Sequence, residues 1–150
     1  MFLTNYGQQI IDQFAKENGM TKTRVTVESP FAGDRERNRA YLLRAMLDSC
    51  ARGEAPLASH MLYTQFLDDD IPEQRDMGIE CGLAWASLAE KMIFYVDYGM
   101  SNGMERAQAY ALENNILVVE RKIGTNEDVI HSAIKAFKFS ELYGHNSSQS

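Results

Sequence analysis

Short apolar strands alternate with longer amphipathic segments, and this alternation is the feature that most constrains the fold. Strand composition is found in TRVTVESP, the start of APLASHMLYTQF, KMIFYVD and ILVVERKI, which begin at residues 23, 55, 91 and 116. Such alternation with short connections predicts a parallel sheet covered by helices on both faces. We therefore expect an α/β fold, a small doubly wound parallel sheet of about four strands that is Rossmann- or flavodoxin-like, with extra N- and C-terminal helices.

Capping residues indicate where the helices of this fold begin and end. Asp34 can cap a helix over residues 32–54, which Gly53 ends. Pro72 and Ser101 can begin two further helices. The helix that follows Asp34 has an apolar face, which we expect to consist of Leu42, Leu43, Met46, Leu47 and Cys50.

Charge and composition exclude several classes of partner. The 150-residue chain carries 21 acidic and 15 basic side chains, a net charge of −6, without a block of Lys or Arg. A nucleic-acid backbone is therefore not an expected partner. No apolar run is long enough to span a bilayer and no signal peptide is recognisable, so we expect a cytoplasmic protein without membrane contact. Cys50 and Cys81 lack the spacing of metal ligands, and we expect neither a metal nor another cofactor.

Four polar segments are expected at the carboxyl edge of the sheet, where proteins of this architecture bind ligands. The first is ESPFAGDRERN (28–38), whose backbone N–H groups can hold an anion together with Arg35 or Arg37. A turn that simply carries a capping Asp explains the same residues. The second segment is SHMLYTQ, in which His60 suits a structural hydrogen bond as well as a catalytic role.

The third segment is LDDDIPEQR (67–75), with the acidic run Asp68, Asp69 and Asp70. Such a run suits a solvated loop or the orientation of a sugar hydroxyl, and no EF-hand spacing follows it. The fourth is DYGMSNGMERAQAYA (97–111), a turn at the end of an apolar strand that leads into a helix. Turns of this kind bind phosphates and sugars in α/β proteins.

Taken in order, these segments resemble the nucleoside 2-deoxyribosyltransferase-like superfamily, especially its branch of small bacterial and phage proteins. The resemblance extends from about Arg24 to Arg121 and rests on SPFAGDRERN, SHMLYTQ with DDD, and GIECGLAWASLAEKMIFYVDYGMSNGM. It implies an enzyme that cleaves or exchanges the N-glycosidic bond of a (deoxy)nucleoside or a nucleoside monophosphate. It also implies a set of ligand-binding residues: Ser29, Phe31, Gly33, Asp34, Arg37, Asn38, His60, Asp70, Ser101, Asn102 and Gly103.

The chain departs from this superfamily at the catalytic carboxylate. The superfamily motif reads approximately Ser-x-Gly-x-x-x-Glu, and Ser101 and Gly103 match it, but the Glu position is Ala107. Glu105 lies two residues earlier, and two residues of α-helix rotate a side chain by roughly 200°. Glu105 and Asp97 are the candidate catalytic residues, although a carboxylate in a first helical turn also interacts favourably with the helix dipole without any catalytic role.

Two hypotheses follow from this departure. The first is an N-glycosidase or deoxyribosyltransferase that acts on a nucleotide. The alternative is a non-catalytic binder that sequesters a nucleotide or a cyclic ADP-ribose-like signal, in the manner of a phage anti-defence protein. We expect an N-terminal helical extension (1–22), a deoxyribosyltransferase-like domain (23–123) and a C-terminal helix with a disordered tail (124–150). The apolar faces of helices at 3–17 and 127–143, and the resemblance, lead us to expect a homo-oligomer, a dimer or larger.

Overall fold

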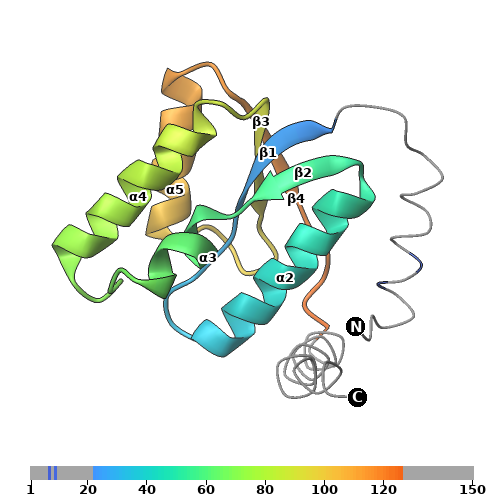
Figure 1. The fold of residues 1–150 in the computed structure, drawn as a ribbon. Coiled ribbons are helices and arrows are strands. Elements are labelled where there is room, and N and C mark those ends of the chain that lie inside the picture. Colours follow the sequence, from blue (N-terminus) through green and yellow to red (C-terminus); the bar gives the residue numbers. More distant parts are fainter. Residues whose placement is uncertain (1–6, 8, 10–21, 127–150) are drawn as a thin grey trace, which may run out of the picture.

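A computed structural model describes residues 7, 9 and 22–126 of the chain (Figure 1). Within this part, four parallel strands form one sheet in the order β2-β1-β3-β4. The strands are β1 (Thr23–Glu28), β2 (Glu54–Leu57), β3 (Lys91–Tyr95) and β4 (Leu117–Arg121). The helices are α2 (Arg35–Ala51), α3 (Ser59–Leu62), the 3₁₀ turn η1 (Tyr63–Gln65), α4 (Pro72–Ala86) and α5 (Asn102–Glu113). The predicted α/β fold class is confirmed, while the helices predicted at 3–17 and 127–143 lie outside the described residues apart from positions 7 and 9.

Helices cover both faces of the sheet, with α2 on one side and α4 and α5 on the other (Figure 1). The α2 side has a core of strand and helix residues: Val25, Val27, Tyr41, Leu42, Ala45, Ala58, Ile93 and Tyr95. The opposite side has a second core: Ala86, Met92, Phe94, Met104, Ala107 and Ala111. Because side chains alternate along a strand, Val25 and Val27 face α2, while Thr26 and Glu28 face α4 and α5. Glu28 is paired in register with Phe94 of the second core.

The predicted helix starts are confirmed by their capping geometry. The Asp34 side chain accepts a hydrogen bond from the Arg37 backbone N–H at 3.1 Å, and the Ser101 hydroxyl accepts one from the Met104 N–H at 3.3 Å. Pro72 is the first residue of α4. Gly53 follows the end of α2 with a φ of +79°, a conformation that favours glycine.

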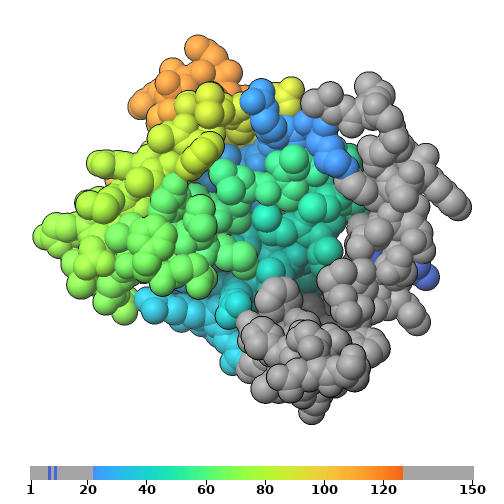
Figure 2. Space-filling model, viewed as in Figure 1, coloured from blue at the N-terminus to red at the C-terminus, as the bar shows by residue number. Residues whose placement is uncertain are grey.

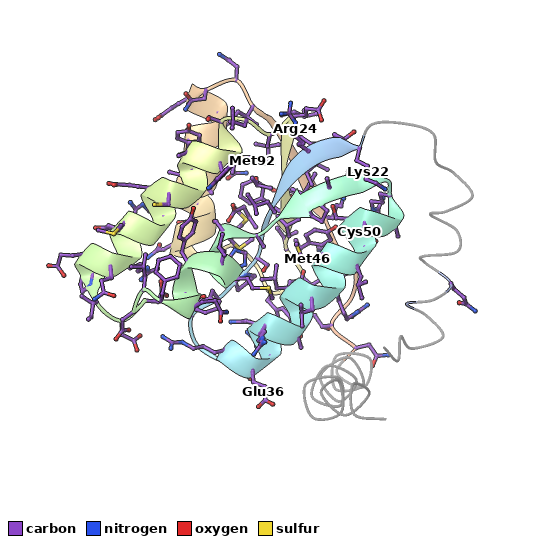
Figure 3. All side chains as sticks on the ribbon, viewed as in Figure 1. Lys22, Arg24, Glu36, Met46, Cys50 and Met92 are labelled. Atoms are coloured by element: carbon purple, nitrogen blue, oxygen red, sulfur yellow. The ribbon has the colours of Figure 1, made fainter. Side chains whose placement is uncertain are left out.

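The buried face of α2 differs from the predicted one. Leu42 is buried as expected, but Leu47 is 38% exposed. The residues that face the sheet recur at helical spacing: Asn38, Tyr41, Leu42, Ala45 and Ser49. Met46 and Cys50 lie at the margin of this face, and Glu36 points away from it (Figure 3). The prediction considered only apolar residues. The face of α2 that packs on the sheet also contains polar side chains, which are buried because their polar atoms form hydrogen bonds.

A buried carboxylate joins the strands on the α2 side. Glu54, at the start of β2, is 4% exposed. Its Oε1 lies 2.7 Å from both Lys91 Nζ and Arg121 Nη2, and its Oε2 accepts a 2.7 Å hydrogen bond from the Ser49 hydroxyl. Burial alone would raise the pKa of Glu54, but the hydrogen bonds from Arg121, Lys91 and Ser49 lower the pKa to about 2. Glu54 is therefore ionised and fully paired.

Large apolar side chains are exposed along α3, η1 and α4, the green to yellow-green side of Figure 2. They are Leu62, Phe66, Met77, Trp85 and Leu88, and Phe66 is 69% exposed. Within the described part of the chain, the helices are too short or too polar to cross a bilayer.

We expect Glu54→Gln to lower the free energy of unfolding at pH 7 by about 3 kcal/mol, because two partly buried cations lose their anion. The effect should disappear as the pH falls from about 4.5 towards 2, the range in which Glu54 is ionised only in the folded state. Urea denaturation at several pH values measures this, with Glu120→Gln on the exposed side of β4 as the matched control. A destabilisation that is the same at pH 2 as at pH 7 would contradict the ionic explanation.

Candidate functional site

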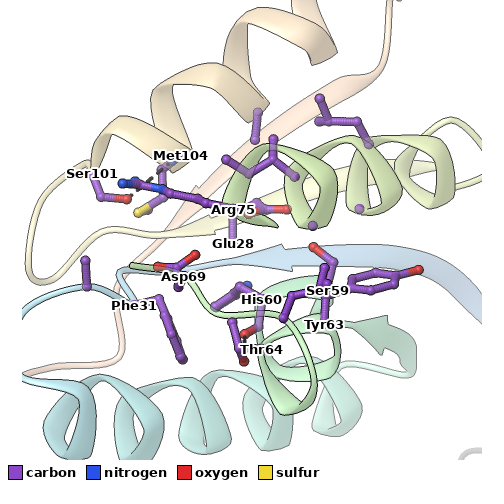
Figure 4. A pocket seen from close by; sticks show the side chains of 18 of the residues that line it. Glu28, Phe31, Ser59, His60, Tyr63, Thr64, Asp69, Arg75, Ser101 and Met104 are labelled. Carbon is purple, nitrogen blue, oxygen red and sulfur yellow. Dashed lines mark hydrogen bonds between the residues drawn. The ribbon is translucent and has the colours of Figure 1, made fainter. Parts of the chain in front are cut away.

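A cavity of about 110 Å³ lies at the carboxyl ends of β1 and β2, on the side of the sheet that α4 and α5 cover (Figure 4). This place is the switch point of the sheet, since the chain leaves β1 towards α2 and leaves β3 towards α5 on the opposite face. Its enclosed part is large enough for several water molecules or a sugar-sized group, and a larger ligand would extend through its open side. It is therefore the natural ligand site of this fold.

Glu28, the last residue of β1, lies in the cavity (Figure 4). Its position follows from strand alternation, which turns Glu28 to the same side as Phe94. Among the described residues its carboxyl group has no hydrogen-bond or ion-pair partner. Burial raises the pKa of Glu28 from 4.5 to about 8, because a carboxylate would be poorly solvated there. Glu28 is half-buried, and its place in the cavity favours the protonated form of its carboxyl group. The sequence did not single this residue out.

His60, the second residue of α3, forms the wall beside Glu28 (Figure 4). Its Nε2 lies 3.0 Å from the Ser29 hydroxyl, and its ring meets Phe31 edge-on with centroids 6.2 Å apart. The His60 Nδ1 is buried and has no hydrogen-bond partner among the described residues. Burial lowers the pKa of His60 to about 4, so the imidazole is neutral at physiological pH. Three of the predicted site residues, Ser29, Phe31 and His60, thus lie in one wall of the cavity.

Charged groups and the start of α5 form another wall. Ser101 and Gly103 line the cavity at the first turn of α5, and the Arg75 side chain reaches towards them from α4 (Figure 4). Asp69, in the loop before α4, lies across from this pair. Neither Arg75 nor Asp69 has an ion-pair partner within the described part of the chain. A helix start with a nearby guanidinium is suited to an anion. Arg75 ends the third polar segment of the sequence, but only the acidic run of that segment was predicted to contact a ligand.

A close approach between α3 and α4 shapes the inner end of the cavity. Gly82 of α4 packs directly on Ser59 of α3, and a Cβ added at Gly82 would stand 2.8 Å from the Ser59 Cβ. Both residues line the cavity. Any larger residue at position 82 would push α3, with His60, away from α4.

The rest of the predicted first loop supports the cavity without lining it. Asn38 is 1% exposed, and its Nδ2 donates to the backbone oxygens of Phe31 and Ala32 at 3.2 and 2.8 Å. The Arg37 guanidinium donates to Asn38 Oδ1 and lies over the Tyr98 ring at 4.1 Å from its centroid. Gly33 adopts a φ of +89° in the turn that precedes the capping Asp34. Arg37 is thus not brought to the cavity, in contrast to the predicted anion contact.

Asp97, a predicted catalytic residue, lies outside the cavity on the α2 side. Its Oδ2 accepts hydrogen bonds from the Tyr41 hydroxyl at 2.6 Å and the Ile123 N–H at 2.8 Å, and its Oδ1 accepts one from the Gly124 N–H at 2.7 Å. Burial would raise the pKa of Asp97, but these hydrogen bonds lower it. Both oxygens are engaged in holding the end of β3 to the segment after β4, which is a structural task.

Glu105, the other predicted catalytic residue, is exposed and does not line the cavity. It borders a more open hollow between α4 and α5, which shares Asp69 and Arg75 with the cavity. Two predicted ligand-binding residues, Asp70 and Asn102, also line this hollow. Asp70 is paired with Arg35 at 2.8 Å on the surface. The residue of α5 that does line the cavity is Ala107, which is 4% exposed. The helix therefore presents a methyl group at the position where the resembling enzymes carry Glu.

Within residues 22–126, no three His, Cys, Asp or Glu side chains are grouped so that they could hold a metal ion. The family model described as a domain of unknown function (DUF7768) matches residues 23–121. No curated protein and no solved structure matches the chain.

Because Glu28 is protonated in the folded state and ionised in the unfolded state, it makes folding stability depend on pH. The pKa of Glu28 is higher in the folded protein than in the unfolded chain. The contribution of Glu28 to the free energy of unfolding is therefore greatest below about pH 4.5, where Glu28 is protonated in both states, and it falls as the pH rises to about 8. We expect Glu28→Gln, which imitates the neutral acid, to raise the free energy of unfolding by up to about 3 kcal/mol at pH 7, at about 1.4 kcal/mol for each pKa unit.

Denaturation of the wild type and the variant between pH 4 and pH 9 measures this difference. The exposed Glu113 on α5 provides the matched control, since Glu113→Gln should leave the pH dependence unchanged. Parallel curves for Glu28→Gln and the wild type would show that Glu28 is ionised in the folded protein.

Proposed function

The chain belongs to the DUF7768 family, and we propose that the cavity of this family member binds a nucleoside or nucleoside 5′-monophosphate and cleaves or exchanges its N-glycosidic bond. The observation that carries the proposal is one cavity at the switch point that combines an anion-binding end with an apolar end holding a carboxyl group. The resemblance of residues 24–121 to nucleoside 2-deoxyribosyltransferase-like enzymes supports the same chemistry.

The phosphate is assigned to the end of the cavity at α5. The first N–H groups of a helix have no partner within that helix, and the helix dipole favours negative charge there. Arg75 supplies a positive charge at the same end. Asp69 lies nearby, where its carboxylate would accept hydrogen bonds from sugar hydroxyl groups.

The sugar and base are assigned to the deeper part of the cavity. Apolar side chains form most of this part, from Phe31 on the first loop to Ile79 and Leu83 on α4 and Met104 on α5. Flat apolar and aromatic surfaces suit a nucleobase. Glycosidic cleavage passes through an oxocarbenium-like state, for which carboxyl groups beside the sugar are the usual catalysts. Glu28 and Asp69 are the carboxyl groups that line this cavity.

A second candidate function is sequestration of a nucleotide, or of a cyclic ADP-ribose-like signal, without turnover. The observation that favours it is Ala107, because a methyl group in the cavity wall provides no nucleophile. A binder of this kind suits a phage anti-defence protein. It would release its ligand intact on denaturation, whereas an N-glycosidase would yield free base.

Homo-oligomerisation and a cytoplasmic location stay predictions. The exposed side chains along α3 and α4, among them Phe66 and Trp85, offer an apolar surface that supports association of two copies. Light scattering over a range of concentrations tests the association.

The experiment that tests the function is calorimetric titration with the nucleosides and the 5′-monophosphates of each common base, in ribo and deoxy forms. Each mixture is then analysed by liquid chromatography for free base. We expect a dissociation constant in the micromolar range or below for at least one monophosphate, and release of base from it. Binding with quantitative recovery of intact nucleotide would favour sequestration, and absence of binding throughout the panel would refute the proposal.

We expect Arg75→Ala to weaken binding of the monophosphate by roughly ten- to a hundred-fold, because a charge-assisted hydrogen bond contributes about 1.5–3 kcal/mol. Affinity for the matching nucleoside, which lacks the phosphate, should change little. Arg106→Ala is the matched control, since Arg106 is an exposed residue paired with Asp76 at 2.9 Å. Equal loss of affinity for nucleoside and monophosphate would remove the phosphate contact from Arg75.

A further inference from the structure

Glu28 is the carboxyl group that the backbone of the sheet itself places in the cavity. It ends β1 and lies level with Phe94 in the central pair of strands, so its position depends on the register of the sheet and not on a loop. Figure 4 shows its side chain in the space between β1 and the two helices above it. The register therefore fixes the backbone position of Glu28 at the cavity that Ala107 and Met104 also line.

The surroundings of Glu28 favour its protonated form. The titratable groups that face the cavity are His60 from α3, Tyr63 from η1, Asp69 from the loop before α4, and Arg75 from α4. The lining residues of α5 are all uncharged: Ser101, Gly103, Met104 and Ala107. His60 is neutral, and within the described chain no cation is paired with Glu28 to hold it as a carboxylate. Burial raises the pKa of Glu28 to about 8, which leaves the proton on the acid at neutral pH.

We propose that Glu28 is the general acid of this cavity and protonates the nucleobase as it leaves the sugar. This inference rests on the proposed N-glycosidic activity and deepens it by naming the group that moves the proton. A buried carboxylic acid that stays protonated at pH 7 is suited to this task, because it can donate a proton to a weakly basic ring nitrogen or carbonyl oxygen.

The step is balanced as follows. The bond between the anomeric carbon and the base nitrogen breaks, both its electrons go to the base, and the base takes the proton of Glu28. The sugar becomes an oxocarbenium ion, and a water molecule adds to its anomeric carbon. The surplus proton of that water returns to the Glu28 carboxylate. The net reaction is nucleotide plus water giving free base and sugar phosphate, and the acid is restored.

Ala107 decides between hydrolysis and transfer in this scheme. A covalent sugar–enzyme intermediate needs a carboxylate nucleophile, and α5 presents a methyl group in its place, while the lining carboxylate Asp69 is assigned to the sugar hydroxyl groups. The oxocarbenium ion is then captured by water directly, so a second base cannot displace an enzyme-bound sugar. The reaction that follows from the structure is hydrolysis, without exchange of one base for another.

The test compares the wild type with Glu28→Gln and Glu28→Asp on the monophosphate that binds best in the panel described above. Glutamine retains one donor and one acceptor and has no transferable proton, so binding should stay within about three-fold while base release falls at least 100-fold. Aspartate should restore part of the rate. In the wild type the rate should be constant below about pH 8 and fall about tenfold for each pH unit above it. Glu113→Gln is the matched control.

Several outcomes would overturn the assignment. Glu28→Gln that releases base at the wild-type rate, or a wild-type rate that rises with pH towards 8, would show that Glu28 is not the acid. Tight binding by the wild type without any base release would refute the catalytic inference and leave nucleotide binding standing. Exchange of the base with an added free base would contradict the hydrolytic scheme. Lack of nucleotide binding would refute the proposed function itself.

Discussion

The architecture depends on one buried carboxylate, that of Glu54. It draws together Lys91 from β3, Arg121 from β4 and the Ser49 hydroxyl from α2. Because β1 lies between β2 and β3, these contacts bridge the width of the sheet beneath α2. Both oxygens of the Glu54 carboxylate are paired or hydrogen-bonded. Movement of a partner away from Glu54 is unfavourable, because it would leave a buried charge unpaired. The strands are thus fixed to one another on the side away from the cavity, and the opposite side can carry groups that contribute little to stability.

Two such groups, Glu28 and His60, form the inner part of the cavity, and both are neutral at physiological pH. The charged residues Arg75 and Asp69 lie nearer the start of α5 and the loop before α4. The cavity is therefore divided into an uncharged end and a charged end. A nucleotide has the same division, with an apolar base at one end and a phosphate at the other. This match in polarity supports the proposed function and does not depend on the identity of the base.

Strand–helix alternation and capping residues were sufficient to predict the fold. Pro72 and Ser101 mark helix starts through local backbone chemistry, so they could be read from sequence without knowledge of tertiary contacts. The site was harder to predict. Glu28 stands next to polar loop residues in the sequence, so it was not predicted as a site residue. Side chains alternate along β1, and since Val25 and Val27 face α2, Glu28 faces α4 and α5. This argument requires knowing which face of the sheet α2 covers. Asp97 was predicted to be catalytic from the superfamily resemblance and its place in the turn after β3. Its hydrogen-bond partners, such as Tyr41, are 26 or more residues away along the chain. Long-range hydrogen bonds of this kind leave no local signal.

The engagement of Asp97 also fixes where the chain leaves the domain. Its carboxylate holds the N–H groups of Ile123 and Gly124, and Arg44 of α2 donates to the Ile123 backbone oxygen at 3.0 Å. The polypeptide after β4 is therefore tethered to the α2 side, with the sheet between it and α4 and α5. Ile123 and Gly124 thus lie on the opposite side of the sheet from the cavity. A spectroscopic label placed on this segment would report on the fold without occupying the candidate site.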